Sequence, residues 1–161
     1  MATAADILTY LKEVKDPEIP VLAIEDLGVI RDIEVNDKKV HVQITPTYSG
    51  CPAMDMIEVE IKATLQEKGF EPSVELVLSP AWTTDWITPA GRAALEEYGV
   101  AAPLDESADK RALMGAAHEV RCTNCGSDNT QMVSQFGSTA CKALFKCMDC
   151  HEPFDYFKCL K

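Results

Sequence analysis

Two Cys-x-x-Cys pairs near the C-terminus constrain this chain more than any other feature of its sequence. Cys122 and Cys125 form the first pair, Cys147 and Cys150 form the second, and 21 residues separate the two pairs. Each pair closes a tight turn that directs two sulfur atoms at one point, and four thiolates in a tetrahedron are typical of a zinc site. Gly126 follows the first pair, where such a turn needs a residue at positive φ. The spacing therefore predicts a four-cysteine metal site.

The segment between the two pairs predicts a zinc ribbon. Residues 131–136 and 143–146 favour short strands. Because a module of about 45 residues cannot bury a sufficient core, we expect structural Zn²⁺ to supply its folding energy. Four thiolates also hold a single iron or an iron–sulfur cluster, but this spacing favours zinc. Cys141 and Cys159 remain, either as small buried side chains or as a second thiol pair.

Cysteine content, hydropathy and charge limit the compartment and the partners. The chain has seven cysteines and no recognisable export signal, so we expect a cytoplasmic protein with reduced thiols. No apolar run approaches the ~20 residues that span a bilayer, so no membrane partner is expected. The net charge is −11; residues 1–116 hold 10 Lys/Arg and 21 Asp/Glu, and residues 117–161 hold 5 of each. Neither part has the basic surface of a nucleic-acid-binding protein.

The first hundred residues predict a domain of their own. Periodicity predicts three helices and three strands, at 4–14, 52–68 and 88–98 and at 29–35, 40–44 and 73–79. The order α-β-β-α-β-α predicts a small α+β domain with a mostly antiparallel sheet and helices on one face. The polar segment 101–116 favours a linker. We therefore expect domains at 1–100 and 117–161.

The one cysteine of the first domain, Cys51, lies between a predicted strand and the longest predicted helix. A helix N-terminus carries partial positive charge, which is expected to lower the pKa of a thiol placed there. Gly50 lets a ligand approach the backbone. Polar candidates for supporting the thiol are the hydroxyl groups of Thr47 and Ser49 and the carboxyl groups of Asp16, Glu18, Glu25 and Asp26. The alternatives are a buried structural cysteine and acidic residues that serve only in loops and caps.

No catalytic residues are predicted. A Cys–His hydrolase would need His41, the only histidine of the first domain, beside Cys51. The chain has no Glu-x-x-His pair for a di-iron site and no Gly-x-Gly-x-x-Gly for a dinucleotide. We therefore expect an accessory protein rather than an enzyme, because handling of iron or a cluster fits a reactive thiol without a paired base.

Five short motifs of the first domain occur together in one order. They are Asp16-Pro-Glu18, Ile24-Glu-Asp-Leu-Gly-Val-Ile30, Gly50-Cys51-Pro52, Ser79-Pro-Ala-Trp82-Thr83 and Arg92. In this order and spacing they resemble the MIP-type family of iron–sulfur assembly proteins, which is related to the SufT-like domains. Two positions depart from the family pattern, since Tyr48-Ser49 stands where a proline often precedes Gly-Cys-Pro and Ala81 replaces a proline before the tryptophan. The cysteine and the tryptophan are both present.

The C-terminal cysteines extend this resemblance to nearly the whole chain. Together with Phe136-Gly-Ser-Thr139 and Glu152-Pro-Phe-Asp155, they resemble the PaaD branch, the D components of phenylacetyl-CoA 1,2-epoxidase systems for phenylacetate degradation. The resemblance implies a maturation factor that assists an iron or iron–sulfur centre in another subunit, with the iron–sulfur reductase as the expected partner. Alternatives are a scaffold subunit of the epoxidase complex and a thiol-dependent enzyme. Whether the chain forms a homodimer, or itself holds a cluster, stays open.

Overall fold

The structure is a computed structural model that describes residues 1–104, 114 and 120–158. The chain divides into two compact units, Met1–Gly91 and Arg92–Lys161. Most of the segment 101–116, predicted to be a linker, lies outside the described residues, as does Cys159. In the part of the chain that is described, no helix is both long enough and apolar enough to cross a membrane.

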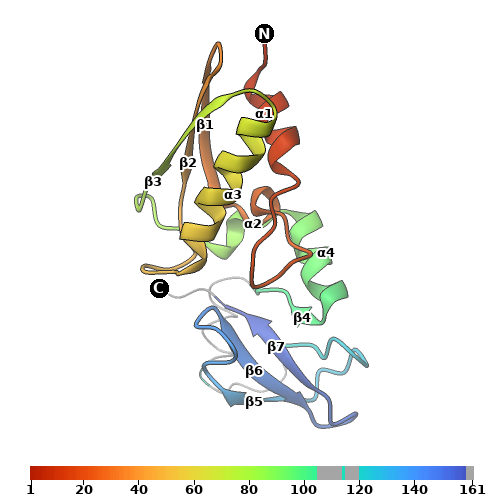
Figure 1. Ribbon diagram of the computed structural model, residues 1–161. Helices are drawn as coiled ribbons and strands as arrows, with labels where there is room; N and C mark the ends of the chain where they lie inside the picture. The colour runs from red at the N-terminus through yellow and green to blue at the C-terminus, as the bar shows by residue number, and fades with distance from the viewer. Residues whose placement is uncertain (105–113, 115–119, 159–161) are drawn as a thin grey trace. The chain divides into compact units, whose positions relative to one another are not determined.

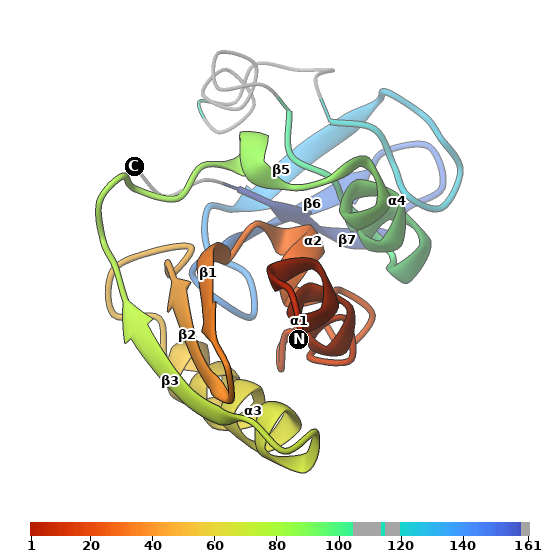
Figure 2. The same cartoon turned by 90° about the horizontal axis from the view of Figure 1, so that it is seen from above.

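The first unit contains a three-stranded sheet, β1-β2-β3, with helices packed on it. Its elements are α1 (Ala4–Leu11), α2 (Ile24–Leu27), β1 (Ile30–Asn36), β2 (Lys39–Ile44), α3 (Ala53–Glu67), β3 (Glu71–Leu76) and η1 (Thr84–Trp86). Figures 1 and 2 show α3 lying along one face of this sheet. The core takes alternate residues of β2 and the i, i+3, i+4 stripe of α3, namely Val40, Val42, Ile44, Met54, Ile57, Ile61 and Leu65.

Strand direction in this sheet differs in part from the prediction. β1 and β2 form the predicted antiparallel hairpin, which turns at Asp37 with φ 58°. β2 and β3 are parallel, with Val42 opposite Val74. The reason is that α3 is a crossover connection. It returns the chain to the end of the sheet at which β2 begins, so β3 runs in the same direction as β2. The sheet thus has one antiparallel and one parallel pair, rather than being mostly antiparallel.

Helix ends follow the capping residues. At α1, Thr3 and Asp6 form a capping box, in which the Thr3 amide donates to Asp6 at 2.7 Å and the Asp6 amide donates to Thr3 at 3.3 Å. The helix α4 (Pro89–Tyr98) begins after Thr88, whose hydroxyl accepts the Gly91 amide at 3.0 Å. Thr88, the first residue of the predicted helix 88–98, is therefore the N-terminal cap of α4.

The second unit is built on a four-stranded sheet in the order β4-β7-β6-β5. The strands are β4 (Val100–Ala101), β5 (Thr130–Ser134), β6 (Lys142–Cys147) and β7 (Pro153–Phe157). β5 and β6 correspond to the two predicted ribbon strands, whereas β7 and β4 were not predicted. β5, β6 and β7 pair antiparallel, and β4 pairs parallel with β7. Ordered structure therefore extends into the first residue of the segment predicted to be a linker.

An aromatic cluster forms the core of the second unit. Phe145 and Tyr156 meet edge to face with their ring centroids 5.5 Å apart, and the ring centroid of Phe154 lies 6.0 Å from that of Phe145. The thiol-bearing Cys122 and Cys147 belong to the same buried cluster. The α+β fold class with a four-cysteine ribbon is thus confirmed, and the loops that carry the cysteines are continuous with an apolar core.

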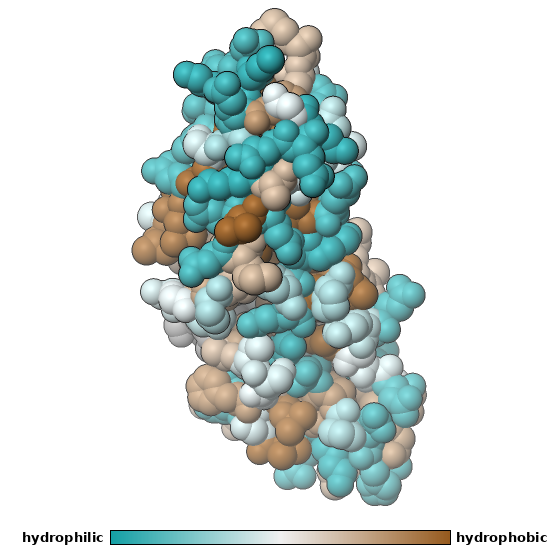
Figure 3. Space-filling view, in the orientation of Figure 1, coloured by the Kyte–Doolittle hydropathy of each residue, from teal (hydrophilic) through white to brown (hydrophobic). Residues whose placement is uncertain are grey.

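Hydrophilic side chains cover most of the face of the molecule seen in Figure 3, with separate apolar patches between them. Exposed large apolar side chains of the first unit include Met56 and Val59 on α3 and Leu76 at the end of β3. Such scattered residues are normal on a folded surface.

Candidate metal centre and thiol site

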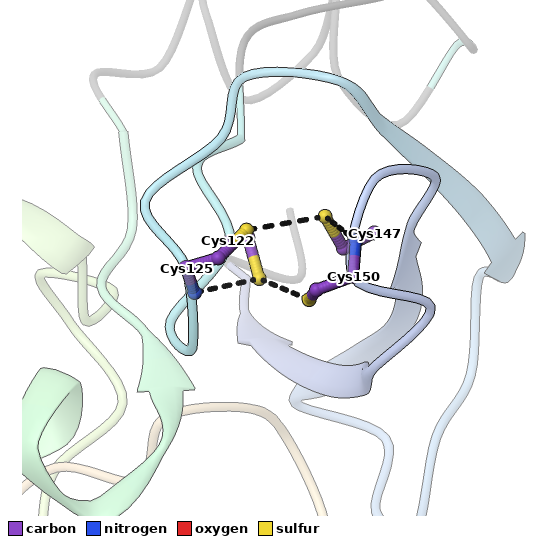
Figure 4. A group of neighbouring side chains, drawn as sticks. All are labelled: Cys122, Cys125, Cys147 and Cys150. Carbon is purple, nitrogen blue, oxygen red and sulfur yellow. Dashed lines mark hydrogen bonds between the residues drawn. The ribbon is translucent and has the colours of Figure 1, made fainter.

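The four predicted metal ligands lie together in the second unit. Cys122 and Cys125 lie on the loop before β5, Cys147 is the last residue of β6, and Cys150 lies on the turn between β6 and β7. Their side chains point toward one another (Figure 4), and the four sulfur atoms all lie within 4.8 Å of each other. Sequence spacing alone located this group of residues.

The backbone follows the same path around each cysteine pair. In the first loop the Cys122 amide donates to the Ser127 carbonyl at 2.9 Å, and in the second the Cys147 amide donates to the Glu152 carbonyl at 3.0 Å. The residue directly after each pair has a positive φ, 77° at Gly126 and 65° at His151. Because His tolerates this region better than most residues, His151 occupies the second loop at the position that glycine fills in the first.

The sulfur geometry fits a tetrahedral zinc ion. With Zn–S bonds of about 2.3 Å, the sulfur atoms of a tetrahedral site lie about 3.8 Å apart. Here the sulfur atoms of Cys122 and Cys150 are 3.7 Å apart, and those of Cys125 and Cys147 are 3.6 Å apart. These distances are far longer than the ~2.05 Å of a disulfide. The four cysteines would hold zinc with no open position, as in structural sites.

Hydrogen bonds to sulfur prepare the site for thiolates. The Asn124 and Cys125 amides donate to the sulfur of Cys122 at 3.4 and 3.5 Å. The Glu152 amide and the Asn124 side chain lower the pKa of Cys150 to about 6. At Cys125 a hydrogen bond from the Ser127 backbone amide to the sulfur also favours the thiolate. Burial and the neighbouring thiols together outweigh this bond and raise the pKa of Cys125 to about 12. A cation shared by all four sulfur atoms removes this competition for protons.

The predicted second thiol pair is described on one side only. Cys141 is buried beside β6, with its sulfur 3.1 Å from the Thr139 hydroxyl, and its carbonyl accepts the Lys158 amide at 2.9 Å. Cys159 lies outside the described residues, so the pair stays a prediction.

The structure places Cys51 directly before α3, half-buried, with a pKa shift opposite to the one expected there. Burial raises the pKa of the Cys51 thiol and outweighs hydrogen bonds from the Ala53 amide and the Tyr48 side chain, and the carboxylates of Glu18 and Asp16 raise it further. The position at a helix N-terminus predicts a lower value. Loss of solvation dominates here, since one amide donor compensates only part of the cost of burying a thiolate.

Four residues predicted to support Cys51 have different surroundings. Asp26 accepts a hydrogen bond from the Thr88 hydroxyl at 2.7 Å, and its carbonyl accepts the Thr88 amide at 2.9 Å, so it holds the start of α4. Ser49 and Gly50 are exposed and Thr47 is half-exposed on the loop that leads to Cys51. Gly50 has φ 79°, which explains a glycine at that position.

Asp16 and Glu18 act on the thiol through their charge. Both carboxylates raise the pKa of Cys51. Asp16 is also fixed by its own turn, because its side chain accepts the Glu18 and Ile19 amides at 2.8 and 3.0 Å. Of the two interpretations of this acidic motif, the hydrogen bonds of Asp16 fit the loop residue, and a supporting role at the thiol stays a prediction.

Sequence reasoning missed one polar group on this loop. Thr45 directly follows β2, and its buried hydroxyl has no hydrogen-bond partner among the described residues. An unpaired buried hydroxyl has no sequence signature, because it depends on what surrounds the side chain in the fold.

Other singled-out residues have structural contacts. The indole of Trp82 is buried and donates to the Leu27 carbonyl at 2.9 Å, so it packs in the core of the first unit. The Arg92 guanidinium donates to the Pro103 carbonyl at 2.5 Å.

His41 lies on the exposed side of the first sheet, and its ring is directed at β3. Its ring nitrogens lie 2.9 Å from the Ser73 hydroxyl and 3.2 Å from the Glu75 carboxylate. Both partners belong to β3, the strand paired with β2. The histidine therefore connects two strands of the sheet.

Two family models match the chain. One, described as an iron-sulfur cluster assembly protein, matches residues 4–76, and one, described as a PaaD zinc beta ribbon domain, matches residues 106–158. Fold, site and matches therefore define a class of protein in which an iron–sulfur assembly domain is followed by a zinc β-ribbon.

Similar proteins narrow this class. An Escherichia coli (strain K12) protein named as the D component of a "Putative 1,2-phenylacetyl-CoA epoxidase" is 47% identical over 159 residues, which cover 96% of this chain and 92% of that protein. The chain therefore belongs to the PaaD family. A Porphyromonas gingivalis protein named "Fe-S protein maturation auxiliary factor" is 35% identical over 55% of this chain and 86% of that protein. A Bacillus anthracis crystal structure of a "Domain of Unknown Function DUF59" has a TM-score of 0.53 at 25% identity, and the match covers 56% of this chain and 89% of that one.

Proposed function

We propose that this protein is a maturation factor of a phenylacetyl-CoA epoxidase system, which assists the assembly of an iron or iron–sulfur centre in a partner subunit. The observation that carries the proposal is the pairing of a half-buried thiol in an iron–sulfur assembly domain with a separate four-cysteine ribbon. The similarity to an epoxidase D component supports the assignment to an epoxidase system. The similarity to maturation auxiliary factors supports a role in the assembly of an iron–sulfur centre. We place this activity in the cytoplasm, where thiols stay reduced.

Cys51 is the residue proposed to handle iron. Because burial keeps its pKa raised, the thiol holds its proton at neutral pH until a cation displaces it. The carboxylates of Asp16 and Glu18 favour the approach of a cation, and the exposed Ser49 and Gly50 leave the loop open to a client. A thiol that binds metal only by losing a tightly held proton suits transient transfer better than storage.

The ribbon has a different role in this proposal. Zinc in a closed four-sulfur site has no position for substrate, so it stabilises the fold of the second unit. That unit then serves to bind the client, proposed to be the iron–sulfur reductase subunit. On this view the protein is an accessory factor without turnover of its own.

Loss of the protein tests the proposal. Cells without it should accumulate the reductase subunit with its two-iron cluster missing, measured by iron and sulfide content and by the visible absorption of the purified subunit. A fully loaded reductase in these cells would refute the proposal. Cys51→Ser should reproduce the defect while the purified variant keeps its zinc, because Cys51 and the four ribbon cysteines belong to different units. Loss of zinc from this variant would contradict the separation of the two sites.

Two rival functions give different results in the same strains. A scaffold subunit would copurify with the epoxidase in stoichiometric amount through high salt, and Cys51→Ser would leave cluster loading unchanged. A thiol-dependent enzyme would turn over a small substrate and lose that turnover in Cys51→Ser. Defective loading without stable copurification is the outcome expected for a maturation factor.

A further inference from the structure

Each cysteine loop of the ribbon is fixed by its own backbone hydrogen bonds, but these bonds do not join one loop to the other. The amide-to-carbonyl bonds from Cys122 to Ser127 and from Cys147 to Glu152 both stay inside a single loop. The β5–β6 ladder brings the loops together at one point, where Thr130 pairs with Cys147. Beyond that point, side-chain contacts must keep the two sulfur pairs at tetrahedral separation before a metal binds, or metal binding must order the loops at a cost in entropy.

Asp149 supplies such a side-chain contact. It lies between the ligands Cys147 and Cys150, yet both of its carboxylate oxygens accept hydrogen bonds from the first loop and the residues that follow it. Asn129 donates its side-chain amide to one oxygen at 2.8 Å, and the Ser127 hydroxyl donates to the other. The backbone repeats the link, because the Met148 amide donates to the Asn129 carbonyl at 2.8 Å.

Electrostatics alone would not favour a carboxylate at this position. Four thiolates around Zn²⁺ have a net charge of −2, and an added negative charge nearby is repelled. A carboxylate fits this position because of its shape: one planar group accepts hydrogen bonds from two donors of the opposite loop at once. Its benefit is therefore the fixed separation of the two loops.

We propose that Asp149 is a positioning residue that holds the two cysteine loops in register and thereby sets how slowly the ribbon releases its metal ion. Outer-sphere groups that orient metal ligands typically change metal affinity by 10–100-fold. Asp149 acts on both cysteine pairs together. Its carboxylate accepts hydrogen bonds from Ser127 and Asn129, which follow the first pair, and the residue itself lies between the two cysteines of the second pair. The inference concerns the metal site alone and does not depend on the proposed maturation role.

Zinc release from the full-length protein tests the proposal. Zinc transfer to a chromophoric chelator should be about 10-fold faster or more in Asp149→Ala than in the wild type. Asp149→Asn keeps one acceptor oxygen and should recover part of the difference. Asp128→Ala is the matched control, because Asp128 lies between Ser127 and Asn129 but its carboxylate pairs with Arg121 at 3.1 Å, on its own side of the site. Its release rate should equal that of the wild type.

A cobalt-substituted protein separates positioning from general destabilisation. The visible d–d absorption of Co²⁺ reports ligand geometry, so it should shift in Asp149→Ala and stay unchanged in Asp128→Ala. If Asp149→Ala does not fold, Asn129→Ala and Ser127→Ala remove the donors from the other side and should each speed release. Release at the wild-type rate in all three variants, or equal acceleration in Asp128→Ala, would overturn the proposal.

Discussion

Gly126→Ala tests the positive φ of the first cysteine loop with few side effects. A Cβ added at this residue would meet no heavy atom within 4 Å, so the substitution causes no clash. Only the backbone conformation is penalised, at φ 77°. A left-handed residue other than glycine costs about 1–2 kcal/mol, and the stiffer unfolded chain returns roughly 0.5 kcal/mol. The net loss is about 1 kcal/mol, which corresponds to an approximately fivefold weaker zinc affinity.

His151→Gly is the matched variant in the second loop. It removes the cost of holding a histidine at φ 65°, while the more flexible unfolded chain cancels most of the gain. We therefore expect zinc affinity within about twofold of the wild type, or tighter. The ratio of the zinc affinities of the two variants is the quantity to measure, because each loop supplies two of the four sulfur ligands of the same ion.

The assay is competition for zinc between the reduced protein and a chromophoric chelator, with circular dichroism to confirm that the sheet is present. The reasoning fails if Gly126→Ala binds zinc as tightly as the wild type. It also fails if His151→Gly weakens zinc binding as much as Gly126→Ala does, because the two loops would then not share one conformational requirement.

Three further outcomes are expected in the first unit. Gly28→Ala should lower the free energy of unfolding by about 2–5 kcal/mol in denaturant titration, because Gly28 has φ 80° and a Cβ would lie 2.6 Å from the Cβ of Trp86; a loss below about 1 kcal/mol would contradict this. Trp82→Phe should cost about 1–3 kcal/mol by the same measurement, because it leaves the Leu27 carbonyl without its indole donor, and an unchanged midpoint would contradict that bond's importance. Iodoacetamide labelling of Cys51, followed by mass spectrometry, should have its pH midpoint above that of the same cysteine in the denaturant-unfolded protein, because burial raises the pKa of the thiol. The stability linked to this proton is present below the unfolded-state pKa and should be lost as pH rises through the raised folded-state pKa. A midpoint at or below that of the unfolded protein would contradict the assigned cause.

Short-range patterns predicted the local structure well. The i, i+3, i+4 apolar stripe identified α3, alternation identified β2, and Thr88 identified the start of α4. Each of these features depends on neighbours within a few residues. The four-cysteine centre was equally predictable, since the ligand identity and the turn geometry are both local to each pair.

Features that depend on distant parts of the chain were not predictable from these patterns. The parallel pairing of β3 with β2 results from the path of the intervening helix. The raised pKa of Cys51 results from burial and from the carboxylates of Glu18 and Asp16, far away in the sequence, which together outweigh a local effect that the sequence did indicate. The link from Asp149 to Asn129 crosses 20 residues and appears only when both loops are folded.

The short strand β4 decides where the ribbon can be separated from the rest of the protein. Val100 and Ala101 pair with Asp155 and Tyr156 of β7. The edge strand of the sheet therefore comes from a segment that precedes the first cysteine loop by about twenty residues. A fragment cut at residue 117 would retain all four ribbon cysteines and still expose an unpaired strand edge prone to self-association. Transfer of a working ribbon to another protein, in the laboratory or by gene fusion, would therefore have to begin upstream of β4.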